Sequence, residues 1–264
     1  MHVVFRESHG LEDTEAPFDL GQTPADLVVL SFSDSDLGAF AAGWHRAGGR
    51  LPSLRLANLV ALKHPMSVDA YVERTLVGVK GILVRVIGGE NYWPYGLMQL
   101  QDHARRNGVA LAVLPADGRE DRALDGYSTL PVSTLRRLSA LCDAGGAVAA
   151  QAALAQLSLA AGLYAGPVVG DKTMPDCGWY DPDRGVIAQP EAVEAPVLIS
   201  FYRSYLTAAD TAPIDALIQA FRAKGIAAYG LFVPSLKATG APAFLAEALA
   251  AVPPAAIINA TAFS

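Results

Sequence analysis

The final part of the chain, residues 195–264, repeats one pattern three times. An apolar run ends in a polar cluster, and a helical stretch separates each run from the next; the runs are residues 197–201, 226–233 and 255–258. Parallel strands that are buried on both faces have this pattern, with the reactive groups left at their carboxyl ends. We therefore expect the order strand, helix, strand, helix, strand in this part of the chain. This order is the first half of a Rossmann-like α/β domain, so we expect a second, truncated domain here.

The composition narrows the class of protein. A chain of 264 residues with 52% apolar and 17% charged residues can form about two domains with buried cores. The net charge is −6 and no run of lysine or arginine occurs, so nucleic acid is not an expected partner. Two cysteines are too few for a disulfide framework, and the start of the chain has no secretory signal. We expect a cytoplasmic protein.

Residues 144–170 carry no charge and are rich in alanine. Alanine favours membrane insertion far less than leucine or phenylalanine does. We therefore predict no membrane span but a buried or interface helix, with contacts from Leu154, Leu157 and Leu159. A role at a membrane surface remains open.

The front of the chain alternates short apolar runs with helical patterns. The predicted strands are residues 27–30, 54–56, 82–87 and 109–114, and Ser33 and Ser67 are the predicted caps of the helices that follow the first two. This alternation predicts a parallel sheet. We expect a flavodoxin-like three-layer α/β domain over residues 1–143, an alanine-rich helix with a Pro- and Gly-rich connector over 144–194, and the second domain over 195–264.

Polar and aromatic side chains follow the predicted strands, at the edge where doubly wound sheets bind ligands. Aromatic faces with fixed cations and amides suit a large planar ligand that carries carboxylates. The candidate binding residues are His64, Tyr92, Trp93, Tyr202, Arg203 and Asn259.

Several of these positions have a second interpretation. His64 is either a metal ligand or proton carrier, or an ordinary residue of a turn before a proline, and we favour the latter. Arg85 lies inside an apolar run, where it needs either an ion-pair partner or a ligand. The aromatic residues 92–95 form either a lid or ordinary packing. For Arg203, at the end of a strand, we slightly favour a functional role.

Common catalytic and cofactor motifs are missing from the sequence. No G-x-G-x-x-G follows a strand, and no P-loop, G-x-S-x-G or H-E-x-x-H motif occurs. The five histidines are scattered without the spacing of metal ligands. No motif in this chain therefore predicts a bound cofactor, and we leave the catalytic residues unassigned.

Six segments, in order along the chain, resemble the amino-terminal region of the large subunit of aerobic cobaltochelatase, the CobN type. This family also contains the large subunit of magnesium chelatase. Residues 142–194 match it less well. The matching segments are residues 19–26, 54–59, 64–74, 201–204, 211–217 and 259–263.

The resemblance implies an enzyme subunit of cobalamin biosynthesis. Such a subunit binds hydrogenobyrinic acid a,c-diamide, and two partner subunits hydrolyse ATP with Mg while cobalt(II), the metal substrate, is inserted in a ligase reaction. Family chains are several times longer, so this chain would be an amino-terminal fragment that is inactive alone, with the catalytic residues downstream. Arg203 would orient the carboxylates of the corrin, and Tyr202 and Trp93 would face its ring.

Two alternatives stay open. One is a non-catalytic module that binds a tetrapyrrole or another small molecule. The other is a fragment of the magnesium chelatase large subunit, which is less favoured because residues 64–67 and 213–217 are more similar to the cobalt type.

Overall fold

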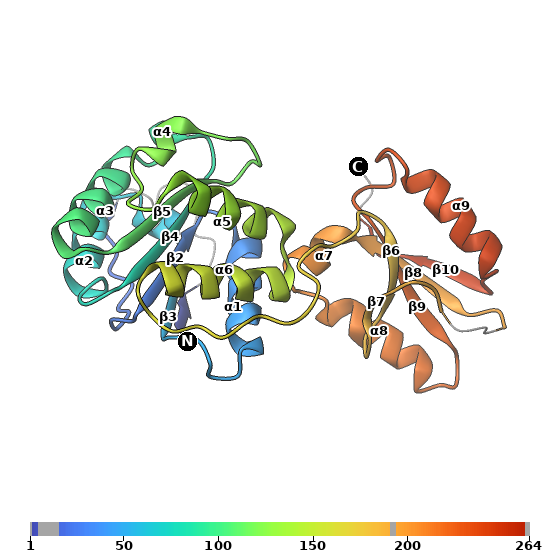
Figure 1. Cartoon of the computed structure of the whole chain (residues 1–264). Coiled ribbons are helices and arrows are strands. Elements are labelled where there is room, and N and C mark those ends of the chain that lie inside the picture. The colour runs from blue at the N-terminus through green and yellow to red at the C-terminus, as the bar shows by residue number, and fades with distance from the viewer. Residues whose placement is uncertain (1, 5–15, 191–193, 262–264) are drawn as a thin grey trace. The chain divides into compact units, whose positions relative to one another are not determined.

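The chain forms two compact units, Met1–Thr173 and Met174–Ser264 (Figure 1). The computed structural model describes residues 2–4, 16–190 and 194–261. Phe263, in the last segment that resembles the cobaltochelatase family, lies outside these residues. The boundary between the units falls inside the segment that we expected to be a connector. Each unit has its own sheet and its own hydrophobic core, and each is described separately below.

Unit 1 is built on a parallel sheet with the strand order β1-β3-β2-β4-β5. Its strands are β1 (His2–Val4), β2 (Leu27–Ser31), β3 (Leu54–Asn58), β4 (Gly81–Val86) and β5 (Ala110–Pro115). Every residue of β2, β4 and β5 is buried, because helices cover both faces of the sheet. The expected parallel α/β fold is confirmed for this unit.

Along each strand, successive side chains point to opposite faces of the sheet. Val28, Leu30, Ile82 and Val84 pack on one face, and Leu27, Val29 and Leu83 pack on the other. The first face is covered by α2 (Pro65–Arg74) and α3 (Pro94–Asn107). The second is covered by α1 (Asp34–Arg46), α5 (Val132–Ala144) and α6 (Gly146–Ala160). The short elements η2 (Leu59–Leu62), η3 (Glu90–Tyr92) and α4 (Arg122–Asp125) complete the unit.

The amino-terminal ends of α1 and α2 show which of the predicted cap residues is a cap in the structure. Ser33 caps α1 as predicted, because its side chain accepts a hydrogen bond from the backbone of Asp36. Helix α2 begins two residues before the predicted cap, Ser67. Pro65 occupies its first turn, and His64 is its N-cap. Ser67 lies within the helix, where its hydroxyl accepts a hydrogen bond from the Phe18 backbone at 2.8 Å.

Helix α6 packs closely on α1, and it belongs to unit 1 rather than to a connector between domains. The contact needs a glycine at position 43, because a Cβ there would lie 2.6 Å from the backbone nitrogen of Gln151. An alanine-rich helix permits this approach because its side chains are short.

Unit 2 contains a mixed sheet with the strand order β10-β8-β9-β6-β7. Strands β8, β9 and β10 are parallel, and β6 pairs antiparallel with both β9 and β7. Its elements are β6 (Gly178–Asp181), β7 (Gly185–Ile187), β8 (Val197–Tyr202), α7 (Arg203–Thr207), α8 (Ala212–Arg222), β9 (Ala228–Val233), α9 (Ala241–Ala251) and β10 (Ala256–Asn259).

The segment before β8 supplies two strands that we expected to be loop. Gly178 makes the first of these possible, because a Cβ at this position would lie 2.7 Å from the ring of Phe232 on the neighbouring strand. The three parallel strands and two long helices of residues 195–264 are present as predicted. The sheet of unit 2 is therefore larger than the predicted half-domain.

Candidate functional site

The candidate site in unit 1 lies at the carboxyl edge of its sheet, where the strand order reverses. Strand β2 has β3 on one side and β4 on the other, although β3 and β4 both follow it in the chain. Ligands of doubly wound sheets bind outside such a switch point. Ser31 of β2 is paired in register with Arg85 of β4 here.

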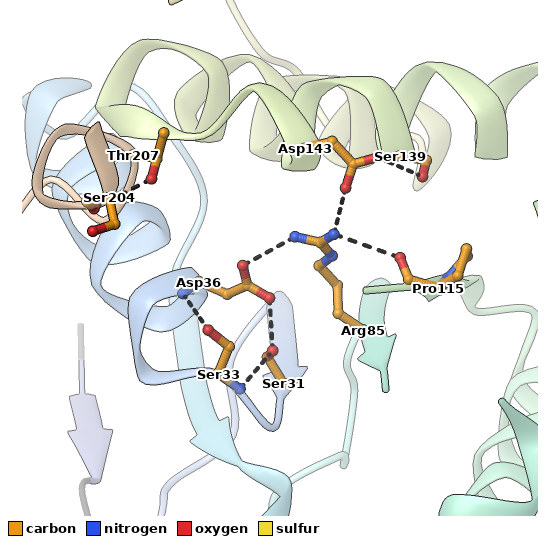
Figure 2. Close-up of polar contacts among 9 residues, drawn as sticks. All are labelled: Ser31, Ser33, Asp36, Arg85, Pro115, Ser139, Asp143, Ser204 and Thr207. Atoms are coloured by element: carbon orange, nitrogen blue, oxygen red, sulfur yellow. Dashed lines mark hydrogen bonds and ion pairs between the residues drawn. The ribbon is translucent and has the colours of Figure 1, made fainter. Parts of the chain in front are cut away.

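The side chain of Arg85 is enclosed by carboxylates from two helices (Figure 2). Its Nη1 lies 3.0 Å from Oδ1 of Asp36 on α1, and its Nη2 lies 2.5 Å from Oδ1 of Asp143 on α5. The residue is only 4% exposed. A buried guanidinium needs such partners, so these contacts favour the ion-pair interpretation of Arg85.

Asp36 lies in the first turn of α1, and its carboxylate faces Arg85. Its Oδ2 accepts a hydrogen bond from the Ser31 hydroxyl at 2.8 Å, and Ser33 caps the helix beside it (Figure 2). A helix N-terminus attracts anions, but here the chain supplies its own carboxylate. One guanidinium faces two carboxylates, so a further anion is disfavoured on this face of the sheet.

Cys142 lies beside this network, and its thiol has low reactivity. Burial raises the pKa of its thiol to about 12, although Arg85 opposes the shift. The thiol therefore stays protonated at neutral pH and is a poor nucleophile or metal ligand.

The opposite face of the switch point is aromatic. Phe32 follows β2 and Tyr92 ends η3, and their rings meet edge to face with centroids 5.1 Å apart. The Nζ of Lys63 lies 6.0 Å from the centroid of Phe32 and 5.9 Å from that of Tyr92. Tyr92 is 54% exposed. We call these three residues the aromatic–lysine cluster; it presents the exposed ring of Tyr92, supported by the edge-to-face contact with Phe32, and one cation.

A pair of glycines shapes the turn that carries Tyr92. Gly88 and Gly89 both have φ of +78°, a region that side chains rarely adopt. A Cβ at Gly88 would also lie 3.2 Å from Cδ2 of Tyr92, so glycine lets the ring settle against the turn. A pocket of about 310 Å³ opens beside the same turn, and its walls include Asp117 and Arg119.

The other predicted residues of unit 1 have different roles. His64 is half-buried, and its Nδ1 accepts a hydrogen bond from the Met66 backbone at 3.2 Å as the cap of α2. Trp93 is 4% exposed, and its Nε1 donates to the carbonyl of Leu62 at 2.8 Å. Trp93 therefore presents no ring face for stacking and acts as a core residue in this structure.

In unit 2 the predicted residues cluster at the carboxyl ends of β8 and β10. Arg203 donates from Nε to the carbonyl of Pro175 and from Nη2 to that of Met174, both at 3.0 Å. Its guanidinium thus holds the first residues of the unit in place. Tyr202 is half-buried and ends β8.

Asn259 lies beside Ser200 at the switch point of unit 2, where β8 has β9 on one side and β10 on the other. Its Oδ1 accepts hydrogen bonds from the Ser200 hydroxyl at 2.9 Å and from the Thr261 hydroxyl at 2.6 Å. Asn259 itself is exposed. We call these three residues the hydroxyl–amide cluster.

The structure thus brings Tyr92 beside Lys63, which directly precedes His64, and it brings Tyr202 and Asn259 to one edge of unit 2. A single site that joins residues of both units remains a prediction. Phe32 and Lys63 were not predicted. Their sequence signals were present, because Phe32 directly follows a buried strand and Lys63 directly precedes the candidate histidine.

Within the residues that the structure describes, no group of three or more His, Cys, Asp or Glu side chains could hold a metal ion. In the same part of the chain, no helix is both long and apolar enough to cross a membrane.

Comparisons with known proteins give one consistent result. The model of the CobN/Magnesium Chelatase family matches residues 144–264. Two curated relatives, both named aerobic cobaltochelatase subunit CobN, match the whole chain: the protein of Sinorhizobium sp is 36% identical and that of Pseudomonas aeruginosa is 31% identical. The chain spans 22% of the length of each.

A solved structure, the catalytic subunit of cobaltochelatase from Mycobacterium tuberculosis, matches 90% of this chain with a TM-score of 0.65 and 21% identity. The match covers 18% of that subunit, and at this identity it supports the fold.

Proposed function

This chain belongs to the CobN/magnesium chelatase family, and on that premise we propose that it forms part of the corrin-binding subunit of an aerobic cobaltochelatase. The proposed substrate is hydrogenobyrinic acid a,c-diamide, into which the complete enzyme inserts cobalt(II) during cobalamin biosynthesis. The similarity to CobN subunits over the full length of the chain supports the cobalt rather than the magnesium reaction.

We also propose that unit 1 is a flavodoxin-like layer sandwich. The strands β3, β2, β4 and β5 follow one another in the order 2-1-3-4, which is how a flavodoxin-like sheet begins. Helices on both faces of the sheet support this assignment.

The aromatic–lysine cluster is the observation that carries the proposed binding role. An exposed tyrosine ring offers a stacking face to a planar macrocycle, and Lys63 offers a cation to a carboxylate at the rim of that macrocycle. His64 adds a hydrogen-bond donor. Because its Nδ1 accepts from Met66, the proton of the neutral ring is assigned to Nε2.

The residues of unit 2 would bind the polar rim of the corrin. The described contacts of Arg203 with the carbonyls of Met174 and Pro175 use Nε and Nη2, and the carboxylate of Asp176 lies 3.8 Å from Nε, so we propose that a carboxylate of the corrin binds at Nη1 in competition with Asp176. Asn259 offers its amide nitrogen, because the described contacts of its side chain use only the oxygen. Tyr202 would contact the ring beside them.

Partner subunits would supply the energy for insertion. The resemblance to the CobN type implies two ATPase-type partner subunits that hydrolyse ATP with the Mg that it needs, and the lack of a P-loop in this sequence agrees with that assignment. In this proposal cobalt(II) enters as a substrate, and the present chain contributes corrin orientation.

A titration of the chain with hydrogenobyrinic acid a,c-diamide, followed by the absorbance of the corrin, tests the proposed function. We expect saturable binding that weakens about tenfold in each of Tyr92→Ala and Lys63→Ala, because each loses one stacking or charge contact. The matched controls are Tyr164→Ala, an exposed tyrosine elsewhere in unit 1, and Lys80→Ala, at the amino end of β4. Absence of binding, or equal losses in the controls, contradicts the proposal.

A further inference from the structure

Helix α6 is apolar around most of its circumference. One stripe with the spacing i, i+3, i+4, i+7 packs into the core of unit 1. A second stripe with the same spacing lines a groove on the outside of the unit. The first stripe is Ala150, Ala153, Leu154 and Leu157, and the second is Ala152, Ala155, Gln156 and Leu159. In the second stripe Ala152 and Ala155 form the buried floor of the groove, Gln156 is polar, and Leu159 is the exposed apolar residue.

The groove runs between α5, α6 and residues 166–172, and it encloses about 370 Å³. Leu159 on its wall is 55% exposed. Tyr164 and Val169, which flank the lining residues 166–168 in the sequence, are 84% and 79% exposed. An exposed leucine on the wall of an apolar groove, with two exposed apolar residues close to the lining residues in sequence, indicates a contact surface.

The charge of the groove is opposite to that of the chain. Arg137 and Lys172 line it, and no carboxylate does among the described residues, whereas the net charge of the chain is −6. Arg137 donates to Oε1 of Gln156 at 3.3 Å, and Lys172 donates to the carbonyl of Val168 at 3.2 Å, so both cations are held at the rim. An occupant with an apolar face and flanking carboxylates would match this surface.

We propose that this groove docks an acidic amphipathic helix of a partner polypeptide. Two helices with a hollow between them accept a third helix, whose apolar side chains at i, i+3, i+4 and i+7 fill the hollow. The short side chains of Ala152 and Ala155 allow that helix to approach α6 closely. A lipid bilayer is flat and would leave the hollow unfilled.

A synthetic helix of about 18 residues, long enough to be helical in solution, tests the proposal. It carries leucines at i, i+3, i+4 and i+7 and glutamates elsewhere, and its twin carries lysines in place of the glutamates. Fluorescence anisotropy measures the binding of each to the whole chain. We expect the glutamate peptide to bind and the lysine peptide to bind at least about tenfold more weakly.

The double variant Arg137→Glu/Lys172→Glu is expected to reverse this preference. The control Lys80→Glu/Arg105→Glu changes the net charge equally at exposed positions outside the groove and should leave the preference unchanged. Leu159→Glu should also weaken the binding of the glutamate peptide. Circular dichroism of each variant checks that it is folded.

Three results would overturn the proposal: no binding of the glutamate peptide, equal binding of both peptides, or equal effects of the two double variants. Binding of the chain to vesicles of phosphatidylglycerol and phosphatidylcholine, without binding of the peptide, would assign the groove to a membrane surface instead.

Discussion

Both units place a serine near the carboxyl end of a central strand, at the point where the strand order reverses. In unit 1 this is Ser31 of β2, and in unit 2 it is Ser200 of β8. The partner of Ser31 on the neighbouring strand is Arg85, a buried cation with two carboxylates, and the partner of Ser200 is Asn259, an exposed neutral amide.

The difference shows how burial decides what a switch point can do. A buried charge must be paired within the protein, and Arg85 and Asp36 form such a pair. A further anion is therefore disfavoured on this face of unit 1. An exposed amide can exchange its contacts with water or with a ligand at little cost. We therefore propose that ligand recognition in unit 1 uses the opposite, aromatic face, whereas recognition in unit 2 uses the switch point itself.

The largest expected effect follows removal of the buried cation. Arg85→Met leaves the carboxylates of Asp36 and Asp143 without the cation that lies between them, although each keeps a serine hydroxyl as a hydrogen-bond donor, and we expect unit 1 to lose about 3 kcal/mol of unfolding free energy. Urea unfolding measures this loss. The triple variant with Asp36→Asn and Asp143→Asn should recover most of it. If Arg85→Met alone is as stable as the parent chain, the network is not structural.

A second arginine sharpens the comparison. Arg222 in unit 2 also binds two aspartates, with Nη2 2.7 Å from Asp181 and Nη1 3.2 Å from Asp183. Its side chain is 27% exposed, against 5% for Arg85. Solvent screens Arg222 and its contact with Asp183, but the side chain of Asp181 is only 8% exposed, so Arg222→Met should cost about 1–2 kcal/mol in the same urea measurement, less than Arg85→Met. An equal cost for both arginines would show that burial is not the deciding factor.

Substitutions in the hydroxyl–amide cluster should change the stability of unit 2 only slightly. Asn259→Ala removes the acceptor for Ser200 and Thr261, and water can replace it because position 259 is exposed. We expect a loss of about 1 kcal/mol or less in the stability of unit 2. Asn259→Asp, which keeps the acceptor, serves as the matched variant. A loss as large as that of Arg85→Met would contradict the comparison.

Lowering the pH should reduce the stability of unit 2 through Asp181. For this effect we predict a direction and no magnitude. Burial raises the pKa of Asp181, but hydrogen bonds from Arg222 and from the backbone outweigh it and hold the pKa below its usual value. A lowered pKa stabilises the fold above about pH 3.9, the value of a free aspartate, and this contribution is lost as the pH falls through the lowered value.

The urea midpoint of unit 2, compared at pH 7 and in this acid range, should therefore fall less in Asp181→Asn than in the parent chain. The opposite order would show that Asp181 destabilises the ionised fold.

The regular elements could be predicted from the sequence where the apolar pattern was long. Helix α3 is such a case, because its apolar residues are regularly spaced and Gly108 ends it in the left-handed conformation. Strands β6 and β7 could not be found this way, because they have four and three residues in a segment rich in proline and glycine. Strand β6 is stabilised by pairing with β9, and β7 by pairing with β6, and local sequence encodes neither contact.

The candidate site was harder to predict than the fold. The strand ends indicated Tyr92 and Asn259, but sequence alone could not separate Tyr92, which is 54% exposed, from Trp93, which is 4% exposed. The two aromatic residues are neighbours, but Tyr92 rests against the turn at Gly88, whereas Trp93 packs on Gly96, where a Cβ would lie 2.0 Å from its ring. Nor could the sequence reveal that Asp36 and Asp143, which are far apart in the chain, meet at Arg85.

Amide hydrogen exchange of the chain, with and without hydrogenobyrinic acid a,c-diamide, tests most directly where the corrin binds. We predict slower exchange in the ligand complex at residues 59–64 and 88–93 of unit 1 and at residues 200–204 of unit 2, with no change along α1 at residues 34–46. Protection confined to α1 and α5 around Arg85, or no protection anywhere, would contradict the assignment of recognition to the aromatic–lysine cluster.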